Sequence, residues 1–352
     1  MRAFVYTSQP SRVVFRAGAL DDLGAEIERL GAHRALVLST PEQRASAEDV
    51  SKRLGARSAG IYDKAVMHVP IDTAEAAREM AKSSNADCCV AIGGGSTIGL
   101  GKAIALTSDL PILAIPTTFA GSEMTPIYGI TEQGQKKTGR DARVLPKTVI
   151  YDPLLIMTLP VRIAGPSGMN AIAHCVEALY APDGNPITSL MAEEGIRTLA
   201  SSLPLMAMEP QNLEARSEAL YGAWLAGACL GNVGMALHHK LCHTLGGTYN
   251  LPHAETHTVV LPHAVHYNRD AAPKAMIRIT LALEGADPAG GLYDLAKAIG
   301  APLALRDLGM KESALDEAAQ LAIRNPYFNP RPVERAAIRQ LLQDAWEGNR
   351  PG

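Results

Sequence analysis

This 352-residue sequence has no CxxC cysteine pair, few aromatic residues and no large excess of either charge. Its five cysteines form no CxxC pair, which argues against a disulfide framework and against a cysteine-based zinc site. Aromatic residues at 5% and a net charge of −3 provide neither base-stacking platforms nor the basic surface that nucleic acid requires. No apolar run approaches the roughly 20 residues that span a bilayer, and MRAFVYTSQP lacks the apolar core of a secretory signal. We therefore expect a cytoplasmic protein that binds neither nucleic acid nor a membrane.

Short apolar runs alternate with helical stretches from residue 1 to about residue 155. Strands are predicted at 35–40 (ALVLST), 88–96 (CCVAIGGGS), 111–123 (with the strand ending at Pro116) and 148–153 (TVIYDP). Strands that alternate with helices indicate a parallel α/β sheet, in which ligands bind beyond the carboxyl ends of the strands. GGGS and PTTFAGSE should therefore lie at one edge, side by side if their strands are neighbours.

The strand pattern disappears after Pro160, and Ala-, Leu- and Glu-rich segments follow, each bounded by Pro, Gly or Asn. Helices are predicted at 167–180, 187–203, 213–245, 254–267, 274–284, 291–299, 313–324 and 333–346. The sequence thus predicts an α/β domain over 1–157 and an all-helical domain over 158–352.

Histidines concentrate in HHKLCHTLGGTYNLPH, residues 238–253. His239 and His243 are four residues apart, so that they share one helical face, and Gly246-Gly247 is interpreted as the end of that helix. Asn170 and His174 have the same spacing upstream. A lone histidine on an apolar face is usually structural, but several histidines on two segments favour a functional site.

The triple glycine Gly93-Gly94-Gly95 follows a predicted strand and, with Ser96, opens a helical stretch. Backbone N–H groups at such a helix start suit a diphosphate, although the spacing fits neither a Walker A loop nor GxGxxG, and a tight turn is the alternative. The strand at 35–40 ends in Ser39-Thr40-Pro41 without a carboxylate for the adenosine ribose. We therefore expect both NADH and NADPH to be accepted.

GGGS, PTTFAGSE and HHKLCHTLGGTYNLPH together resemble the iron-containing (group III) alcohol dehydrogenase family, and the resemblance covers essentially the whole chain. It implies a Rossmann-like dinucleotide-binding α/β domain followed by an all-α domain, the fold also found in dehydroquinate synthase. It further implies a homodimer. The residues that it assigns to the nucleotide are Gly94, Gly95, Ser96, Thr117, Thr118 and Lys147, and Thr40 lies where the adenosine ribose is expected.

That family holds its metal with an Asp and a His four residues apart, a His that opens HxxxH, and a final His fourteen residues later. His174, His239 and His253 match three of these ligands (253 − 239 = 14), whereas the fourth position is Asn170. Loss of the only anionic ligand weakens affinity for a hard divalent ion, so we expect no metal, although three histidines plus water can bind zinc.

The block at 116–153, dense in TGRDARVLPKTVIYDP, resembles the maleylacetate reductase branch of the family. The resemblance implies reduction of the conjugated C=C bond of maleylacetate by NAD(P)H, which gives 3-oxoadipate in aromatic degradation. Hydride addition β to the ketone leaves an enolate that hydrogen-bond donors stabilise and an acid protonates. We expect His243 and His253 to donate to the enolate or supply the proton, with His239 and His174 in support.

A dicarboxylate substrate calls for cations and other polar partners. Arg140 and Arg143 are candidates, with a solvated basic loop or an intersubunit ion-pair patch as an equal alternative. Tyr327 or Arg331 is a further candidate, and Asn170 is expected to contact the substrate. Competing functions are a metal-dependent alcohol or polyol dehydrogenase, a dehydroquinate-synthase-like lyase and a non-catalytic nucleotide-binding protein. Other histidines are expected to be surface, capping or core groups, namely His33, His68, His257, His263 and His266.

Overall fold

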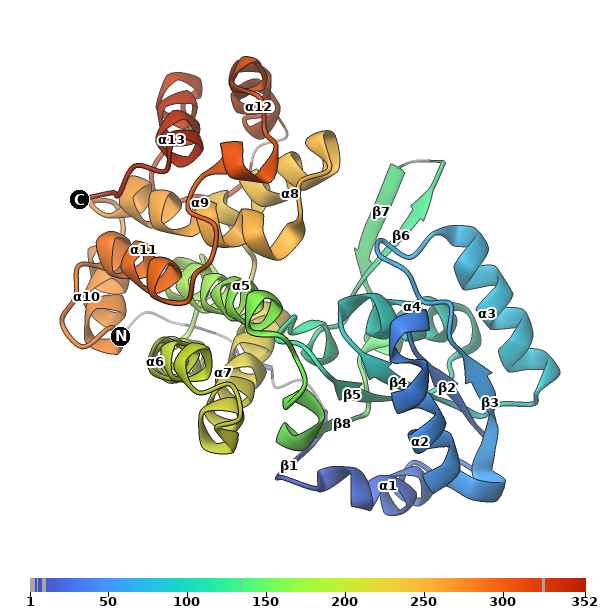
Figure 1. Cartoon of the computed structure of the whole chain (residues 1–352). Coiled ribbons are helices and arrows are strands. Elements are labelled where there is room, and N and C mark those ends of the chain that lie inside the picture. Colours follow the sequence, from blue (N-terminus) through green and yellow to red (C-terminus); the bar gives the residue numbers. More distant parts are fainter. Residues whose placement is uncertain (1–3, 5, 8–10, 134, 325–326) are drawn as a thin grey trace. The chain divides into compact units, whose positions relative to one another are not determined.

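A computed structural model of the chain describes residues 1–352 except 1–3, 5, 8–10, 134 and 325–326. The chain divides into two compact units, one formed by Ser8–Thr158 and the other by Met1–Thr7 with Leu159–Gly352. The division after Thr158 falls one residue from the boundary expected after residue 157. Figure 1 shows strands and helices alternating in the first unit and helices alone along the second.

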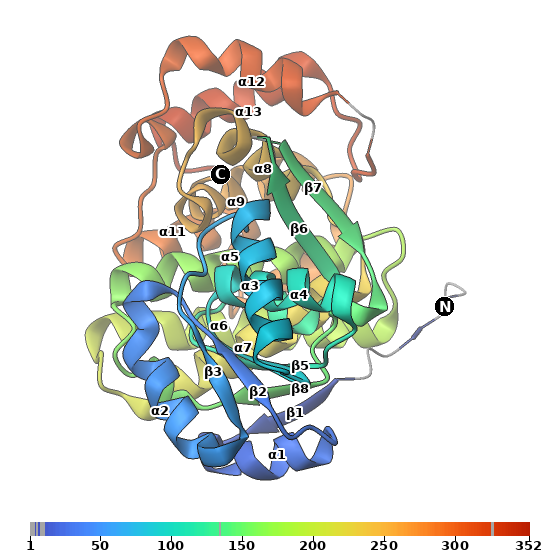
Figure 2. The ribbon, with the colours of Figure 1, turned by 90° about the vertical axis from the view of Figure 1, so that its right-hand side faces the viewer.

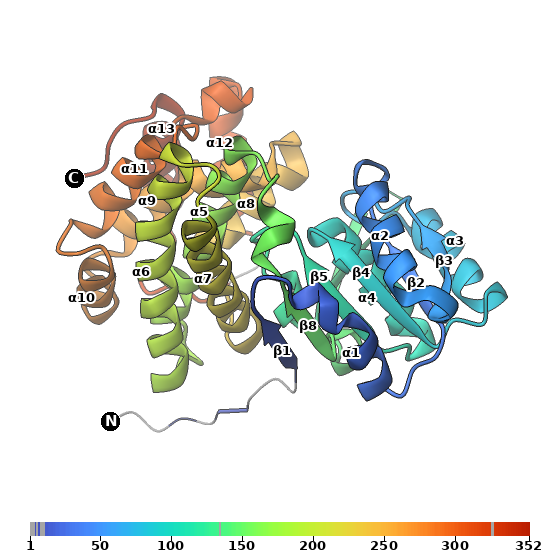
Figure 3. The same cartoon turned by 60° about the horizontal axis from the view of Figure 1, so that its bottom comes forward.

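The Ser8–Thr158 unit is built on six parallel strands in the spatial order β1-β8-β5-β4-β2-β3 (Figure 3). Four of them confirm the strands predicted from the sequence, and β4 and β5 pair with Gly93 opposite Pro116. The GGGS and PTTFAGSE segments therefore leave the same edge of the sheet side by side, as expected. The strands are β1 (Arg12–Phe15), β2 (Ala35–Leu38), β3 (Ser58–Tyr62), β4 (Cys88–Gly93), β5 (Ile112–Pro116) and β8 (Thr148–Tyr151).

The central strands are buried on both faces, which explains their unbroken apolar runs. Alternate side chains such as Val37, Val90 and Ile115 join the core formed with the first two helices. The other face packs against α4, where Gly101 lies within van der Waals distance of Leu38 and Ile112. The longer helices of this unit are α1 (Leu23–Arg29), α2 (Arg44–Leu54), α3 (Ile71–Ser83) and α4 (Gly95–Ser108).

Two further strands form an antiparallel ribbon that the sequence reading missed (Figure 2). They are β6 (Ile127–Glu132) and β7 (Gln135–Arg140). The basic run QKKTGR is therefore a strand and not a loop. β1 and β3 were also missed, because both are only partly buried, and β3 carries a glycine in its middle.

The second unit contains only helices among its described residues from Leu159 onwards, as predicted. No single described helix is long and apolar enough to cross a membrane; α7 and α8 pass that test only as a pair, bent by 95°. The helices are α5 (Val161–Tyr180), α6 (Pro186–Met208), α7 (Leu213–Asn232), α8 (Leu237–Tyr249), α9 (His253–Asn268), α10 (Pro273–Ala282), α11 (Pro288–Ala298), α12 (Leu315–Ala322) and α13 (Arg335–Glu347).

The single helix predicted over 213–245 is wrong, because the chain breaks between α7 and α8. The N–H of Gly234 donates to the Asp183 carboxylate at 3.0 and 3.1 Å. The N–H groups of Ala236 and His238 donate to Glu177 at 2.8 and 2.7 Å. Side-chain carboxylates thus replace the helical acceptors that the break removes.

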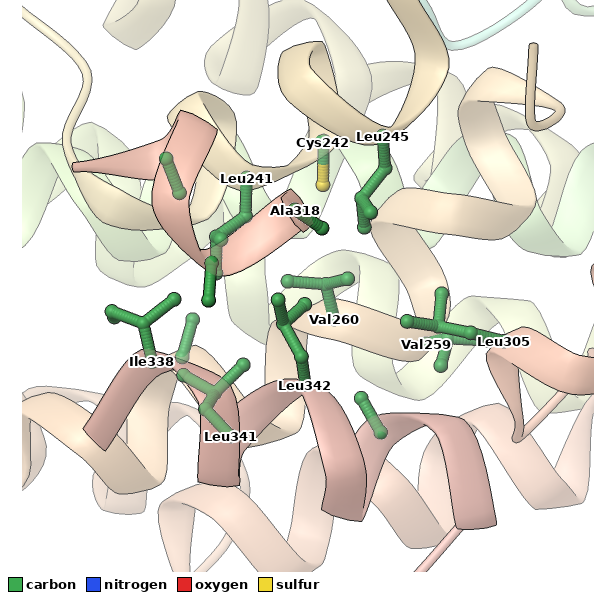
Figure 4. Close-up of a cluster of buried hydrophobic side chains, with 14 of the residues drawn as sticks. Leu241, Cys242, Leu245, Val259, Val260, Leu305, Ala318, Ile338, Leu341 and Leu342 are labelled. Atoms are coloured by element: carbon green, nitrogen blue, oxygen red, sulfur yellow. The ribbon is translucent and has the colours of Figure 1, made fainter. Parts of the chain in front are cut away.

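The end of α8 also differs from the prediction. Gly246 and Gly247 lie inside the helix, which continues to Tyr249 and is capped by Asn250 in the left-handed conformation (φ 53°). Figure 4 shows Leu241 and Leu245 of α8 packed against Val260 of α9 and Leu342 of α13. This core fixes the rotation of α8 about its axis and so sets the direction of its histidines.

Candidate active site

Three helices of the second unit bring the predicted histidines together. His174 of α5 stacks on His239 of α8, with 5.1 Å between ring centroids, and His243 lies one turn along α8 at 6.1 Å from His239. On α9, His253 and His257 are 4.3 Å apart, and His257 is 5.0 Å from His239. The two segments that carry the predicted histidines therefore lie side by side, and the catalytic roles of these residues stay predictions. His174 and His239 are buried, whereas His243 and His253 are exposed.

A buried carboxylate that the sequence reading missed organises this cluster. Glu177 of α5 is fully buried, and its Oε2 atom accepts a hydrogen bond from Nδ1 of His239 at 2.7 Å. The proton on Nδ1 leaves the lone pair of His239 on Nε2. A carboxylate that accepts a hydrogen bond from the far nitrogen of a metal-binding histidine fixes the tautomer and orientation of its ring in this way.

Of the buried polar atoms around this cluster that have no hydrogen-bond partner within the described part of the chain, three belong to residues of the predicted metal-ligand positions. They are Asn170 Oδ1, His174 Nδ1 and His239 Nε2. Unpaired buried polar atoms are costly, and natural proteins retain them mainly where a ligand, an ion or a water completes them. The donor set therefore fits a bound cation as well as a polar substrate.

His238, Cys242 and His257 form a second layer that sequence reasoning did not single out. Nε2 of His238 and Nδ1 of His257 share a hydrogen bond of 2.9 Å, and the Cys242 thiol lies 3.7 Å from His238 Nε2. The potential ligand atoms of this trio all lie within 4.8 Å of one another. His257, expected to be a surface, capping or core group, is a core residue that also lines the histidine cluster.

Three of the buried imidazoles, those of His174, His238 and His257, are held neutral. Burial, followed by the charge of His239, lowers the pKa of His174 and of His238 well below the usual value. Burial and then His253 act in the same way on the pKa of His257, while burial raises the pKa of the Cys242 thiol. Neutral imidazoles each offer one N–H donor and one lone pair, which suits hydrogen bonding or metal ligation.

Apart from Lys147, the predicted nucleotide residues lie at the carboxyl edge of the sheet in the first unit. Gly94 precedes α4, which begins at Gly95, and Thr117 donates its backbone N–H to the carbonyl of Gly93 at 3.0 Å. A Cβ on Gly94 would lie 3.0 Å from the Thr118 hydroxyl, and one on Gly93 (φ 153°) would lie 2.4 Å from that of Thr97. Glycine is therefore required at this turn, whose N–H groups remain open to a phosphate.

Lys102 anchors the segment that follows β5. Its buried ammonium donates to the carbonyls of Ser122 and Ile127 at 2.7 Å and to Thr125. Burial lowers the pKa of Lys102 to about 7, and the charge of buried Glu123 acts in the opposite direction. This network holds the PTTFAGSE segment in place.

An acidic residue stands where the sequence reading found none. Thr40 follows β2, and Glu42 comes two residues later in a short 3-10 turn. Hydrogen bonds from its own backbone N–H and from the Thr40 hydroxyl lower the pKa of Glu42. The expectation about the coenzyme considered only Ser39, Thr40 and Pro41, and so overlooked this carboxylate.

Lys147 does not lie at the nucleotide edge, and its predicted role is corrected. Its backbone N–H donates to Ile112 at the start of β5, whereas the glycine turn is level with Pro116 at the end of that strand. Five residues of strand separate the two edges by about 13 Å. Lys147 is exposed at the amino edge of the sheet.

The predicted substrate contacts divide between the two units. Arg140 ends β7 and Arg143 follows it, and both are exposed. Arg143 donates to Asp141 of the same chain at 2.7 and 3.0 Å, so its guanidinium already has a local anionic partner. Tyr327 lies beside α8, and Arg331 stacks on Tyr267 at 4.2 Å. Residues 325 and 326 of the NPYFNPRP segment lie outside the described residues.

Two family models cover almost the entire chain. The iron-containing alcohol dehydrogenase model matches residues 10–153, and the C-terminal model of the same family matches residues 165–346. These matches overturn the expectation that the protein has no metal, because the family is defined by bound iron. Asn170 removes the charge of one ligand but keeps an oxygen donor. The unpartnered buried atoms of Asn170, His174 and His239 are therefore still suitable metal ligands.

The relatives agree with the resemblance noted in the sequence. A maleylacetate reductase of Burkholderia cepacia is 60% identical over 351 residues, covering 100% of both chains. The crystal structure of maleylacetate reductase from Agrobacterium tumefaciens has a TM-score of 0.97 at 52% identity, with 100% of both chains covered. A structure described as a putative alcohol dehydrogenase from Ralstonia eutropha reaches 0.99 at 60% identity, again over 100% of both chains. The chain belongs to the iron-containing alcohol dehydrogenase family.

Proposed function

We propose that the protein is a maleylacetate reductase, which uses NADH or NADPH to reduce the conjugated C=C bond of maleylacetate and yields 3-oxoadipate. The observation that carries this proposal is the full-length identity of 60% to a protein of that name. The convergence of six histidines on α5, α8 and α9 supplies a site with the donors that the reaction requires.

The reaction needs negative charge to be stabilised away from the carbon that receives hydride. Hydride adds to the alkene carbon β to the ketone, and the electrons of the C=C bond move to form an enolate. A proton then adds to the carbon α to the ketone. Neutral N–H donors suit the enolate oxygen, since they need no change of charge in the buried part of the site.

His243 and His253 are the proposed donors to the enolate or to carbon; with a metal bound, His253 would be one of its ligands, and His243 would remain as the donor. Both are exposed at the surface of the helical unit, so that they can meet a substrate and exchange protons with solvent. His174 and His238 are buried and neutral, which leaves them as hydrogen-bonding and orienting groups. Glu177 keeps the lone pair of His239 on Nε2 and so fixes one wall of the site.

His174, His239 and His253 with Asn170 would hold the metal of the family. A divalent ion there supplies a Lewis acid that polarises the ketone oxygen of the substrate. The Nδ1–H of His239 is already committed to Glu177, which leaves Nε2 for such a ligand role. Asn170 contributes a neutral oxygen in place of a carboxylate, and it can alternatively contact the substrate.

The coenzyme is proposed to bind at the carboxyl edge of the sheet. Gly94, Gly95 and Ser96 would hold its diphosphate at the start of α4, and Thr117 and Thr118 would border it. Thr40 and Glu42 stand where the adenosine ribose is expected, at the end of β2. We further propose that the protein acts in the cytoplasm as a homodimer, as the family resemblance implies.

Oxidation of NADH or NADPH with freshly prepared maleylacetate tests the proposal. We expect turnover that depends on the enzyme and yields 3-oxoadipate, identified by mass spectrometry. His243→Gln and His253→Gln should each lower kcat by about 10²- to 10⁴-fold, the usual range for lost acid–base catalysis. His33→Gln, an exposed histidine of the other unit, is the matched control. Oxidation of a simple diol with NAD⁺, combined with no turnover of maleylacetate, would instead identify an alcohol or polyol dehydrogenase.

A further inference from the structure

The helical unit contains a cation beside the histidine cluster that has no anionic partner. Lys240 lies on α8 between His239 and His243 and is half-buried. Among the described residues no carboxylate lies within salt-bridge distance of its ammonium. The Nζ atom lies over the ring of Tyr327, 5.8 Å from the ring centroid. A cation that is partly desolvated and unpaired is a common feature of sites for anionic ligands.

Tyr327 supplies a second unfulfilled group at the same place. Its hydroxyl is buried and has no hydrogen-bond partner in the described part of the chain. Burial, followed by the charge of Glu177, raises the pKa of Tyr327, so the phenol stays protonated as a donor. Tyr327 also packs against the core that includes Leu241 and Cys242, so it lies beside the helix that carries His239 and His243.

The nearby aromatic residues and cations are engaged elsewhere, which distinguishes this pair. The guanidinium of Arg331 stacks on Tyr267 and donates to the Tyr267 carbonyl at 3.4 Å. The hydroxyl of Tyr267 donates to the carbonyl of Pro332 at 2.7 Å. Lys240 and Tyr327 thus combine a positive charge with a free O–H donor in one place.

We propose that Lys240 and Tyr327 form the subsite for one carboxylate of the substrate, an inference that rests on the proposed function. The ammonium supplies the charge and the phenol supplies a directed hydrogen bond. The contact with the aromatic ring keeps the lysine turned toward the phenol before the substrate arrives. Such a subsite selects substrates with a carboxylate from neutral ketones and enones at the same histidine cluster.

Steady-state kinetics with maleylacetate test the pair through the separation of KM from kcat. Lys240→Met should raise KM about 10- to 100-fold, the worth of a hydrogen bond to a charged group, with kcat within about threefold. Tyr327→Phe should raise KM less, by about three- to tenfold, as for a neutral donor. The double variant should raise KM by less than the product of the two single effects, because both groups bind one carboxylate.

Lys240→Arg keeps the charge and should restore most of the affinity for maleylacetate. Lys297 is an exposed lysine on α11, and Lys297→Met is the matched control. Thermal unfolding of each variant separates lost binding from lost folding. A KM for Lys240→Met within twofold of the wild type, in an enzyme that reduces maleylacetate, would overturn the subsite and leave the proposed function standing. A wild-type enzyme that does not reduce maleylacetate would overturn the proposed function, and this inference with it.

Discussion

Replacement of Glu177 by Gln tests the central arrangement of the helical unit. The carboxylate accepts three hydrogen bonds, from the backbone N–H groups of Ala236 and His238 and from His239 Nδ1, at 2.7 to 2.8 Å. Gln has nearly the same shape, but only one of its terminal atoms accepts. If the amide oxygen takes the position of Oε2, the NH₂ group faces the N–H of His238, and one bond to a charged acceptor is replaced by a donor–donor contact.

Loss of a hydrogen bond to a charged group costs about 1.5–3 kcal/mol, and the two remaining bonds also weaken because the acceptor becomes neutral. We therefore expect a loss of about 2–4 kcal/mol in unfolding free energy. At about 2–4 °C per kcal/mol for a domain of this size, the helical unit should unfold roughly 5–15 °C lower. Circular dichroism during thermal unfolding measures this shift.

Glu194→Gln is the matched control, because Glu194 forms an exposed ion pair with Arg197 at 2.7 Å. Such a pair contributes about 0–1 kcal/mol, so the control should unfold close to the wild type. Equal unfolding temperatures for the Glu177 and Glu194 variants would refute the reasoning. In that case the buried carboxylate would not support the start of α8.

Three further changes probe the metal, the coenzyme and the pH dependence. Asn170→Asp adds an anionic oxygen one helical turn from His174 and should raise the affinity for Fe²⁺ or Zn²⁺ on the order of tenfold or more. Competition with a chelator measures this affinity, and an unchanged value would place residue 170 outside the metal site. Glu42→Gln removes the carboxylate at the end of β2, and should lower the KM for NADPH relative to NADH by about tenfold, whereas an unaltered ratio would exclude Glu42 from coenzyme selection. Burial lowers the pKa of His263 to about 4 in the folded protein, so its contribution to stability is present above its unfolded pKa near 6.5 and is lost as pH falls from 6.5 to 4. His263→Phe should flatten that loss of unfolding free energy by about 3 kcal/mol over this interval, while the exposed His33→Phe control should leave the profile unchanged.

Much of the α/β unit could be predicted from the sequence because its central strands are covered on both faces. CCVAIG and ILAIP are unbroken apolar runs that end at Gly93 and Pro116, and both strands have those ends in the structure. Strand β3 was missed because SAGIY is only partly buried and lacks such a run. The role of Lys147 was assigned from the family resemblance, and a match within a block of sequence does not say at which end of the sheet a residue lies.

The histidines could be found from their spacing, but their partners could not. Glu177 lies three residues after His174 on an otherwise apolar helix, and that lone carboxylate on the histidine face was an available signal. His257 was expected to be a surface, capping or core group; its burial against His238 depends on how α8 and α9 pack. The break before α8 was signalled by the glycines at 231 and 234, but its angle depends on acceptors supplied by Asp183 and Glu177.

The backbone N–H groups at the start of α8 and just before it donate to side chains that are far away in the sequence, Glu177 and Asp183. Most helix ends fray independently of the surrounding protein. The first amides of α8, in contrast, donate to a carboxylate on α5. The amides of Ala236 and His238 should therefore exchange with deuterium only when α5 and α8 separate, at the slow rate of the whole bundle. Evolutionary insertions in this connection would disturb the imidazoles and the bundle at once, which makes it a poor place for the chain to vary.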